Sequence, residues 1–166
     1  MPPLRMPTQG WRESTQQRAM LSIDANILLY AYSEAAPEHG AAHAFISSMS
    51  AEESVALSEF VLTEFYLLLR NPAVLKKPLS APDAVQVIQS YRQHPRWKIL
   101  GFPPTSREVH ADLWQQASKA GIARRRIYDT RTALCLLAFG VTEFATANVK
   151  DFEGFGFERV WNPTLL

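Results

Sequence analysis

Three acidic side chains stand where a fold could gather them. Asp24 directly follows the apolar run 21–23, and two later apolar segments carry Glu64 and Asp129. Two ionised carboxylates about 4 Å apart repel each other by about 4 kcal/mol at an effective dielectric constant of about 20. Acids that the fold brings together would therefore have raised pKa values or bind a cation.

The cation that suits such a cluster is a hard divalent ion. Mg²⁺ and Mn²⁺ prefer oxygen ligands and keep several waters, which fits an open group of carboxylates better than a site built from Cys and His. An ion of this kind orients a water, lowers its pKa and stabilises charge on a phosphodiester oxygen. The acids therefore predict metal-assisted hydrolysis.

Short apolar runs alternate with longer segments of helical periodicity. The predicted strands are 21–23, 54–58, 97–101, 141–145 and 157–161, and the predicted helices are 39–49, 59–70, 84–93, 105–119 and 129–139. This alternation is typical of an α/β fold, with a mainly parallel sheet between two layers of helices. Sites in such folds lie outside the carboxyl ends of the strands, where Asp24, Asn148 and Asp151 are expected.

Composition limits the class of protein. A chain of 166 residues with 47% hydrophobic residues can form one domain with a substantial core. The net charge of +1 excludes a global basic field, so any nucleic-acid contact must be local. The single cysteine allows no internal disulfide, and no apolar stretch reaches the roughly 18 residues of a membrane-spanning helix. We expect a cytoplasmic protein with a flexible tail over 1–19 and one domain over 20–166.

Four stretches resemble the PIN-domain nucleases, and in particular the VapC toxins of bacterial type II toxin–antitoxin pairs. They are LSIDANILLYA (21–31), SEFVLTEFYLLLRNP (58–72), IYDTRTALCLLAFG (127–140) and FATANVKDFEGFGFERVWNP (144–163). The resemblance covers nearly all of 20–166. It implies a PIN-like three-layer α/β/α fold and a Mg²⁺- or Mn²⁺-dependent endoribonuclease that leaves a 3′-hydroxyl and a 5′-phosphate. It also implies a homodimer and a small VapB-like antitoxin.

The same resemblance assigns roles at the acidic site. Asp24 and Asp129 would bind the metal, and Glu64 would orient or deprotonate the attacking water. Many relatives carry an acid where this chain has Asn148, so either this amide or the carboxylate of Asp151 would complete the catalytic acids. The missing charge favours one metal ion over two.

Polar and basic residues around these acids receive supporting roles. Asn26 and Thr146 would hydrogen bond to the acids or their waters. The basic residues predicted to contact RNA are Arg124, Arg125, Arg126, Arg131 and Lys150. Guanidinium groups bind phosphate through paired N–H donors, although a solvated loop is the usual place for such a run. Arg131 and Lys150 could instead pair with a carboxylate.

Other interpretations of the individual residues stay open. Asp24 and Asp129 could simply cap helices, and Glu59 competes with Glu64 for the second acidic position. His39 and His43 have the spacing of some zinc ligands, but the companion Glu of that motif is missing.

Two other functions compete with the nuclease. One is a PIN-like module that binds RNA or a partner without cleaving it, which Asn148 keeps open. The other is a phosphatase of the haloacid-dehalogenase type. That chemistry requires an aspartate two residues after the nucleophile, where this chain has Asn26.

Overall fold

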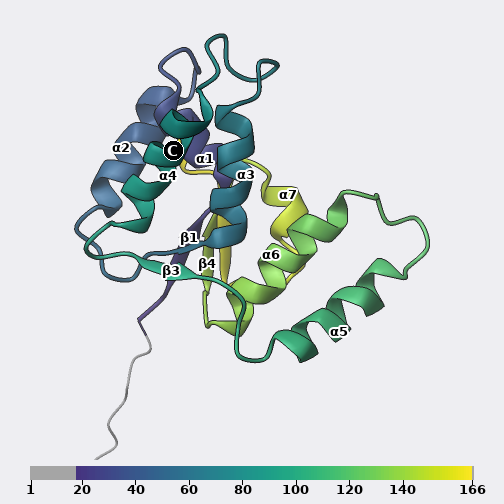
Figure 1. The fold of residues 1–166 in the computed structure, drawn as a ribbon. Helices are drawn as coiled ribbons and strands as arrows, with labels where there is room; N and C mark the ends of the chain where they lie inside the picture. Colours follow the sequence, from purple (N-terminus) through teal and green to yellow (C-terminus); the bar gives the residue numbers. More distant parts are fainter. Residues whose placement is uncertain (1–17, 166) are drawn as a thin grey trace, which may run out of the picture.

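The fold is built on short parallel strands (Figure 1). A computed structural model describes residues 18–165. The strands β1 (Leu21–Ile23), β4 (Glu143–Ala145) and β5 (Arg159–Trp161) form one sheet in the order β1-β4-β5, and β2 (Ala56–Ser58) pairs with β3 (Lys98–Leu100). A parallel bridge between Leu21 and Val55, the residue just before β2, places β1 beside β2. The strands therefore follow the order β3-β2-β1-β4-β5.

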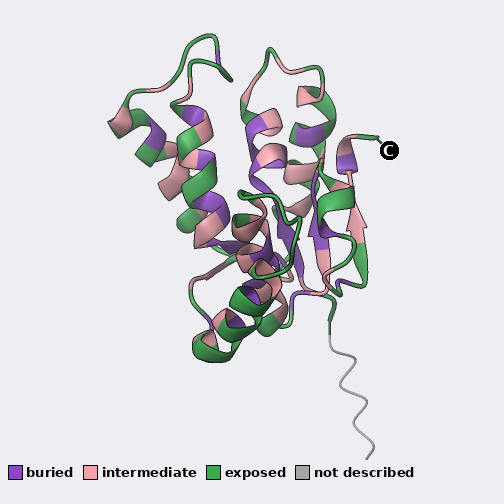
Figure 2. Ribbon diagram, turned by 90° about the vertical axis from the view of Figure 1, so that its right-hand side faces the viewer, coloured by how far each residue is buried: buried purple, intermediate pink, exposed green. Residues whose placement is uncertain are grey.

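Helices cover both faces of these strands. They are α1 (Ala25–Tyr32), α2 (His39–Met49), α3 (Glu59–Leu69), α4 (Ala81–Arg92), α5 (Ser106–Ala117), α6 (Arg126–Ala138) and α7 (Val149–Phe152), and a 3₁₀ turn, η1, spans Pro163–Leu165. Successive strand residues point to opposite faces. Ala145 accordingly joins the core cluster beneath α1 to α4, whereas Phe144 joins the cluster beneath α6 and α7. The central strands β1, β2 and β4 are mostly buried, whereas the edge strands β3 and β5 are partly exposed (Figure 2). The predicted three-layer α/β/α class is confirmed.

The main elements missed by the sequence are α1 and α7. Helix α1 has Ala25, Ile27, Leu28 and Leu29 buried, so its apolar residues show no single stripe from which a helix could be recognised. Helix α7 is a single turn of 4 residues. Helix α6 also begins earlier than predicted, at Arg126, which moves part of the arginine run out of the loop and into the helix.

The predicted tail lies mostly outside the described residues. Only its last residues, Arg18 and Ala19, are described, and both are exposed ahead of β1. The division into a tail and one domain therefore stays a prediction. Within 18–165, no helix is long and apolar enough to cross a membrane.

Candidate active site

Asp24 lies at the carboxyl end of β1 and caps helix α1. Its Oδ1 accepts the Ala25 N–H at 2.8 Å, and its Oδ2 accepts hydrogen bonds from Thr146 Oγ1 at 2.6 Å and Asn26 Nδ2 at 3.0 Å. Capping and a site role are compatible, because the carboxylate still stands at the sheet edge. Only 7% of the residue is exposed. Burial raises the pKa of Asp24 to about 6, despite these three hydrogen bonds.

Asn26 and Thr146 connect Asp24 to the segment that follows β4. Thr146 Oγ1 accepts the Asn148 N–H at 3.0 Å while it donates to Asp24, and Asn26 Oδ1 accepts the Ala147 N–H at 3.1 Å. These bonds fix the backbone that carries Asn148 beside the first acid. The supporting role predicted for Asn26 and Thr146 is compatible with these contacts.

If Asp24 binds a metal as the sequence predicts, replacing Thr146 with valine is expected to lower RNA cleavage by roughly 10- to 100-fold, the usual effect of losing a hydrogen bond that orients a metal ligand. Valine keeps the volume but removes both the donor to Asp24 and the acceptor for the Asn148 N–H. Single-turnover cleavage measures the loss, and Thr146→Ser should restore most of it. Equal activity of the valine and serine variants would contradict a role for the hydroxyl.

Glu64 and Asp129 face the same pocket from different helices. Ser58 begins α3 by accepting the Phe60 N–H at 3.1 Å, which sets the helix phase that carries Glu64 to the pocket. Asp129 lies in the first turn of α6. The pocket has a volume of about 530 Å³. Its lining residues are Phe60, Thr63, Glu64, Leu67, Arg125, Tyr128, Asp129, Arg131 and Thr132.

Charge repulsion couples the three acids. Partial loss of water raises the pKa of Glu64 to about 7, and the negative charges of Asp24 and Asp129 add to that rise. Burial also raises the pKa of Asp129. Arg125 opposes the rise at both Glu64 and Asp129, so one predicted RNA contact lies close enough to affect the acids. Residues far apart in the sequence therefore form one electrostatic unit.

Asp151 and Asn148 are the two candidates to complete the group of acids at the site. Asp151 is exposed and forms an ion pair with Arg126, with Oδ1 3.4 Å from Nη1, yet its charge raises the pKa of Asp129. Asn148 is also exposed, and its side chain does not cap α7. Both side chains therefore lie at the solvent side of the site.

The predicted RNA contacts divide into different environments. Arg124 and Lys150 are exposed, and Arg126 contacts the Phe155 ring in addition to Asp151. Arg131 lies over the Phe60 ring, with its guanidinium carbon 4.2 Å from the ring centroid. Within 18–165 no salt bridge joins Arg131 to a carboxylate, so the ion pair considered for it is not formed there.

The oxygen-rich donor set fits a hard divalent cation in an open site. Among residues 18–165, no three Asp, Glu, His or Cys side chains are arranged to hold an ion between them. Mg²⁺ does not need such a cage, because it binds through one or two carboxylates, its own waters and substrate phosphates. Asp24 and Asp129 offer carboxylates whose mutual repulsion a cation would relieve.

Glu59, which competes with Glu64 in the sequence, and Cys135, the one cysteine of the chain, both lie outside the pocket. Glu59 forms an ion pair with Arg92 at 2.9 Å, which leaves Glu64 as the acid coupled to Asp24. Cys135 is buried and free, and burial raises the pKa of its thiol, which disfavours a nucleophilic thiolate.

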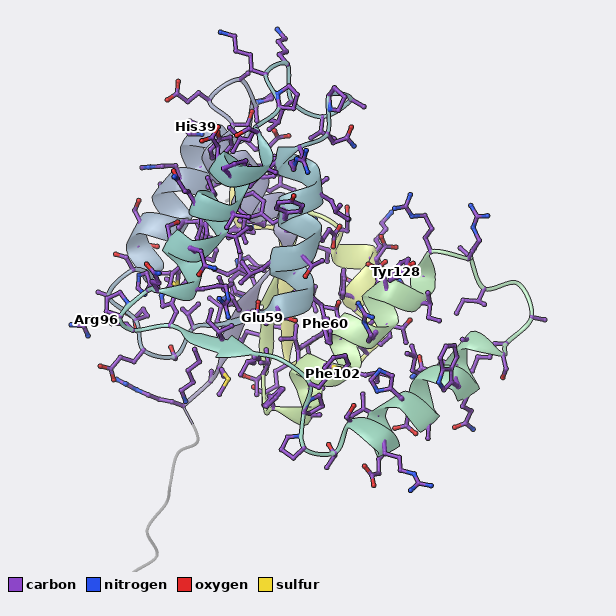
Figure 3. The ribbon with its side chains drawn as sticks, in the orientation of Figure 1. His39, Glu59, Phe60, Arg96, Phe102 and Tyr128 are labelled. Carbon is purple, nitrogen blue, oxygen red and sulfur yellow. The ribbon has the colours of Figure 1, made fainter. Side chains whose placement is uncertain are left out.

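The sequence missed the aromatic part of the pocket. Phe60 and Tyr128 line it beside the acids, and Figure 3 shows Phe60 on α3 and Tyr128 on α6. Tyr128 was part of the IYDT match but received no role. The adjacency of an aromatic residue to Asp129 was the available signal.

Comparison with known proteins identifies the family. A scan against models of protein families finds no match. The chain is, however, 49% identical over 144 residues to Ribonuclease VapC24 of Mycobacterium tuberculosis, covering 87% of this chain and 97% of the relative. The chain belongs to the VapC family of ribonucleases. Ribonuclease VapC33 of the same organism is 26% identical over 148 residues.

Solved structures agree on the VapC fold. The crystal structure of M. tuberculosis VapC20, described as a sarcin–ricin loop cleaving toxin, aligns with a TM-score of 0.60 at 16% identity, covering 82% of this chain and 95% of that one. VapBC2 from Rickettsia felis, bound to a promoter DNA fragment, aligns with a TM-score of 0.59 at 17% identity, covering 86% and 98%. These structures confirm the predicted fold, and the predicted VapC-family ribonuclease is confirmed by the 49% identity to Ribonuclease VapC24.

Proposed function

We propose that this VapC-family ribonuclease is an endoribonuclease that uses Mg²⁺ or Mn²⁺ at the site formed by Asp24, Glu64 and Asp129. The observation that carries the proposal is the electrostatic coupling of these acids, whose pKa values are all raised. Such a cluster favours a divalent cation, and perturbed carboxylates beside a pocket are typical of functional sites.

The ligands that we propose are Asp24 and Asp129, with Asn148 or Asp151 at the solvent side. The bound ion would supply a Lewis acid for the phosphodiester oxygen and for the water that attacks it. Thr146 and Asn26 hold the Asp24 carboxylate in place through their hydrogen bonds.

Glu64 is the proposed base. With a pKa of about 7, it accepts a proton near neutral pH. The water oxygen forms a bond to phosphorus as the bond to the 3′-oxygen breaks. Glu64 takes the proton lost by the water, and the 3′-oxygen leaves as a hydroxyl after taking a proton from solvent. The basic residues Arg124, Arg125, Arg126 and Lys150 contact the RNA backbone.

Removing divalent metal is expected to abolish RNA cleavage. The test uses purified protein without a partner and a mixture of short single-stranded and stem-loop RNAs, in the presence of EDTA, Mg²⁺ or Mn²⁺. Cleavage should occur with either metal and should be absent in EDTA. Undiminished cleavage in EDTA would contradict the metal-dependent mechanism.

The metal-free protein should lose stability as pH rises from about 4 to about 7. Raised pKa values mean that the folded state binds more protons than the unfolded state, so the stabilisation is complete below the unfolded values of 3.8 for Asp24 and 4.5 for Glu64. It is lost as pH passes about 6 for Asp24 and about 7 for Glu64. Asp24 alone accounts for up to about 3 kcal/mol of unfolding free energy.

Urea unfolding in EDTA across this pH range measures the loss. Asp24→Asn is the matched variant, because it cannot titrate and should show a flatter pH dependence. Mg²⁺ should restore stability near the upper end of the range, since an ion that binds only the folded state stabilises it. Parallel pH curves for the wild type and the variant would contradict the assignment.

The proposed partners are RNA, a VapB-like antitoxin and a second copy of the chain. The VapBC2 complex from Rickettsia felis supports the antitoxin, because it aligns over 86% of this chain. The antitoxin would restrain the site until cleavage is required. A cytoplasmic location fits these partners.

A further inference from the structure

An aromatic and cationic wall stands beside the acids in the pocket between α3 and α6. Phe60, Tyr128 and Arg131 line the same pocket as Glu64 and Asp129. Tyr128 is 60% exposed although it immediately precedes Asp129 (Figure 3). A large ring left open to solvent next to a reactive site offers a surface on which a planar group can stack.

Arg131 is held in place by rings instead of by a carboxylate. Its guanidinium carbon lies 4.2 Å from the Phe60 ring centroid and 5.9 Å from the Tyr128 centroid. Within 18–165 it makes no salt bridge, and its Nε is buried without a hydrogen-bond partner. Phe60 is itself supported from another side by the Phe102 ring, whose centroid is 5.0 Å away. The cation is therefore positioned while its outer N–H groups keep their capacity to donate.

The pocket suits an uncharged planar group better than a second phosphate. Glu64 and Asp129 line it together with Arg125 and Arg131, so the formal charges of the lining balance and give an anion no net attraction. A nucleobase carries no charge, stacks on aromatic rings and presents acceptor atoms on its edge to an arginine. A phosphodiester held at the acids would bring its neighbouring nucleotide to this wall.

We propose that Tyr128 and Arg131 form a nucleobase subsite for the nucleotide next to the cleaved phosphodiester. The base stacks on the Tyr128 ring, and Arg131 donates hydrogen bonds to its edge. This inference rests on the proposed RNA cleavage and deepens it, because it assigns to these residues the recognition of a base in addition to the backbone. Both are positioning residues.

A coupled substitution of protein and RNA tests the subsite. The cleavage position is first mapped on a short single-stranded RNA, and an abasic nucleotide is then placed at each position on either side of it. For wild-type protein with Mn²⁺, one position should lower kcat/KM by roughly 5- to 100-fold, the range expected for losing one base–aromatic stack. Tyr128→Ala should cause a similar loss on intact RNA and should be insensitive to the abasic nucleotide at that position.

Matched variants separate stacking from folding. Tyr128→Phe keeps the ring and should retain activity, whereas Arg131→Lys, which keeps the charge but not the planar fork, should weaken cleavage of intact RNA. Trp114→Ala removes an aromatic side chain that is 61% exposed on α5, outside the pocket, and should leave kcat/KM unchanged. Thermal unfolding of each variant verifies its fold.

The outcomes distinguish this subsite from the proposed function. If wild-type protein cleaves no RNA with either metal, the proposed function is overturned and the subsite with it. If wild-type protein cleaves, but the effects of Tyr128→Ala and the abasic nucleotide simply multiply at every position, the subsite alone is overturned. In that case we would expect Phe60, Tyr128 and Arg131 to contact a protein partner instead of a base.

Discussion

Asp24→Asn is expected to lower RNA cleavage by roughly a thousandfold, which corresponds to about 4 kcal/mol of transition-state stabilisation. Asparagine keeps the shape of the side chain but removes the negative charge at the end of β1. Its Oδ1 can still accept the Ala25 N–H, so the cap of α1 is retained. Single-turnover cleavage at saturating Mn²⁺ measures the loss in the chemical step.

The fold of this variant should be intact, which separates chemistry from stability. Burial raises the pKa of Asp24 to about 6, so ionising it opposes folding near neutral pH, and an uncharged amide avoids that cost. Asp112→Asn, a change at an exposed acid on α5, is the control and should cleave like the wild type. Cleavage by Asp24→Asn within a few-fold of that control would refute the metal-site proposal.

Periodicity predicted most of the fold because most elements bury one face. Helix α2 was predicted with the observed bounds, and β1 likewise. Periodicity failed at α1 because that helix is packed on most sides, against α2 and α3, and a helix without a polar face has no stripe. A short strand leading into Asp24 could be predicted, but the helix after it could not.

The candidate site was less completely predictable than the fold. Asp24, Glu64 and Asp129 follow from segment order, because parallel strands and the helices after them bring such positions to one edge. The arrangement of their neighbours depends on tertiary packing. Arg126 pairs with Asp151, and Arg131 packs over the Phe60 ring. Each arginine has several possible partners nearby, and the spacing of residues in the sequence does not show which one it contacts.

The raised pKa values show why distant residues had to be considered together. No other acid lies within one helical turn of Glu64 in the sequence. Its pKa is nevertheless raised by the charges of Asp24 and Asp129, which the fold brings close to it. Arg125 partly offsets this repulsion from the start of α6. Mutually repelling acids therefore lie close together in a chain whose formal net charge is +1. A cation, and not a global basic surface, would allow the RNA backbone to approach.

Glu64→Gln is expected to lower kcat by roughly 100- to 10,000-fold, the contribution usual for a general base. Glutamine can still orient a water but cannot take its proton. The pH profile should change as well. Below about pH 7 wild-type activity should fall by up to tenfold per pH unit as Glu64 gains a proton, and more steeply below about pH 6, where Asp24 gains one as well. A bound cation shifts both steps to lower pH, since it favours the anionic forms.

Glu59→Gln is the matched control for this experiment. Glu59 lies on the same helix but pairs with Arg92 at 2.9 Å, so losing its charge should leave both the rate and the pH profile unchanged. In Glu64→Gln the fall of activity at low pH should become shallower, because only the protonation of Asp24 then remains to reduce the rate. An unchanged fall combined with a lower rate would assign Glu64 to positioning, and the base would then have to be sought elsewhere. A profile and rate equal to those of Glu59→Gln would remove Glu64 from the mechanism, leaving its raised pKa as a consequence of its surroundings alone.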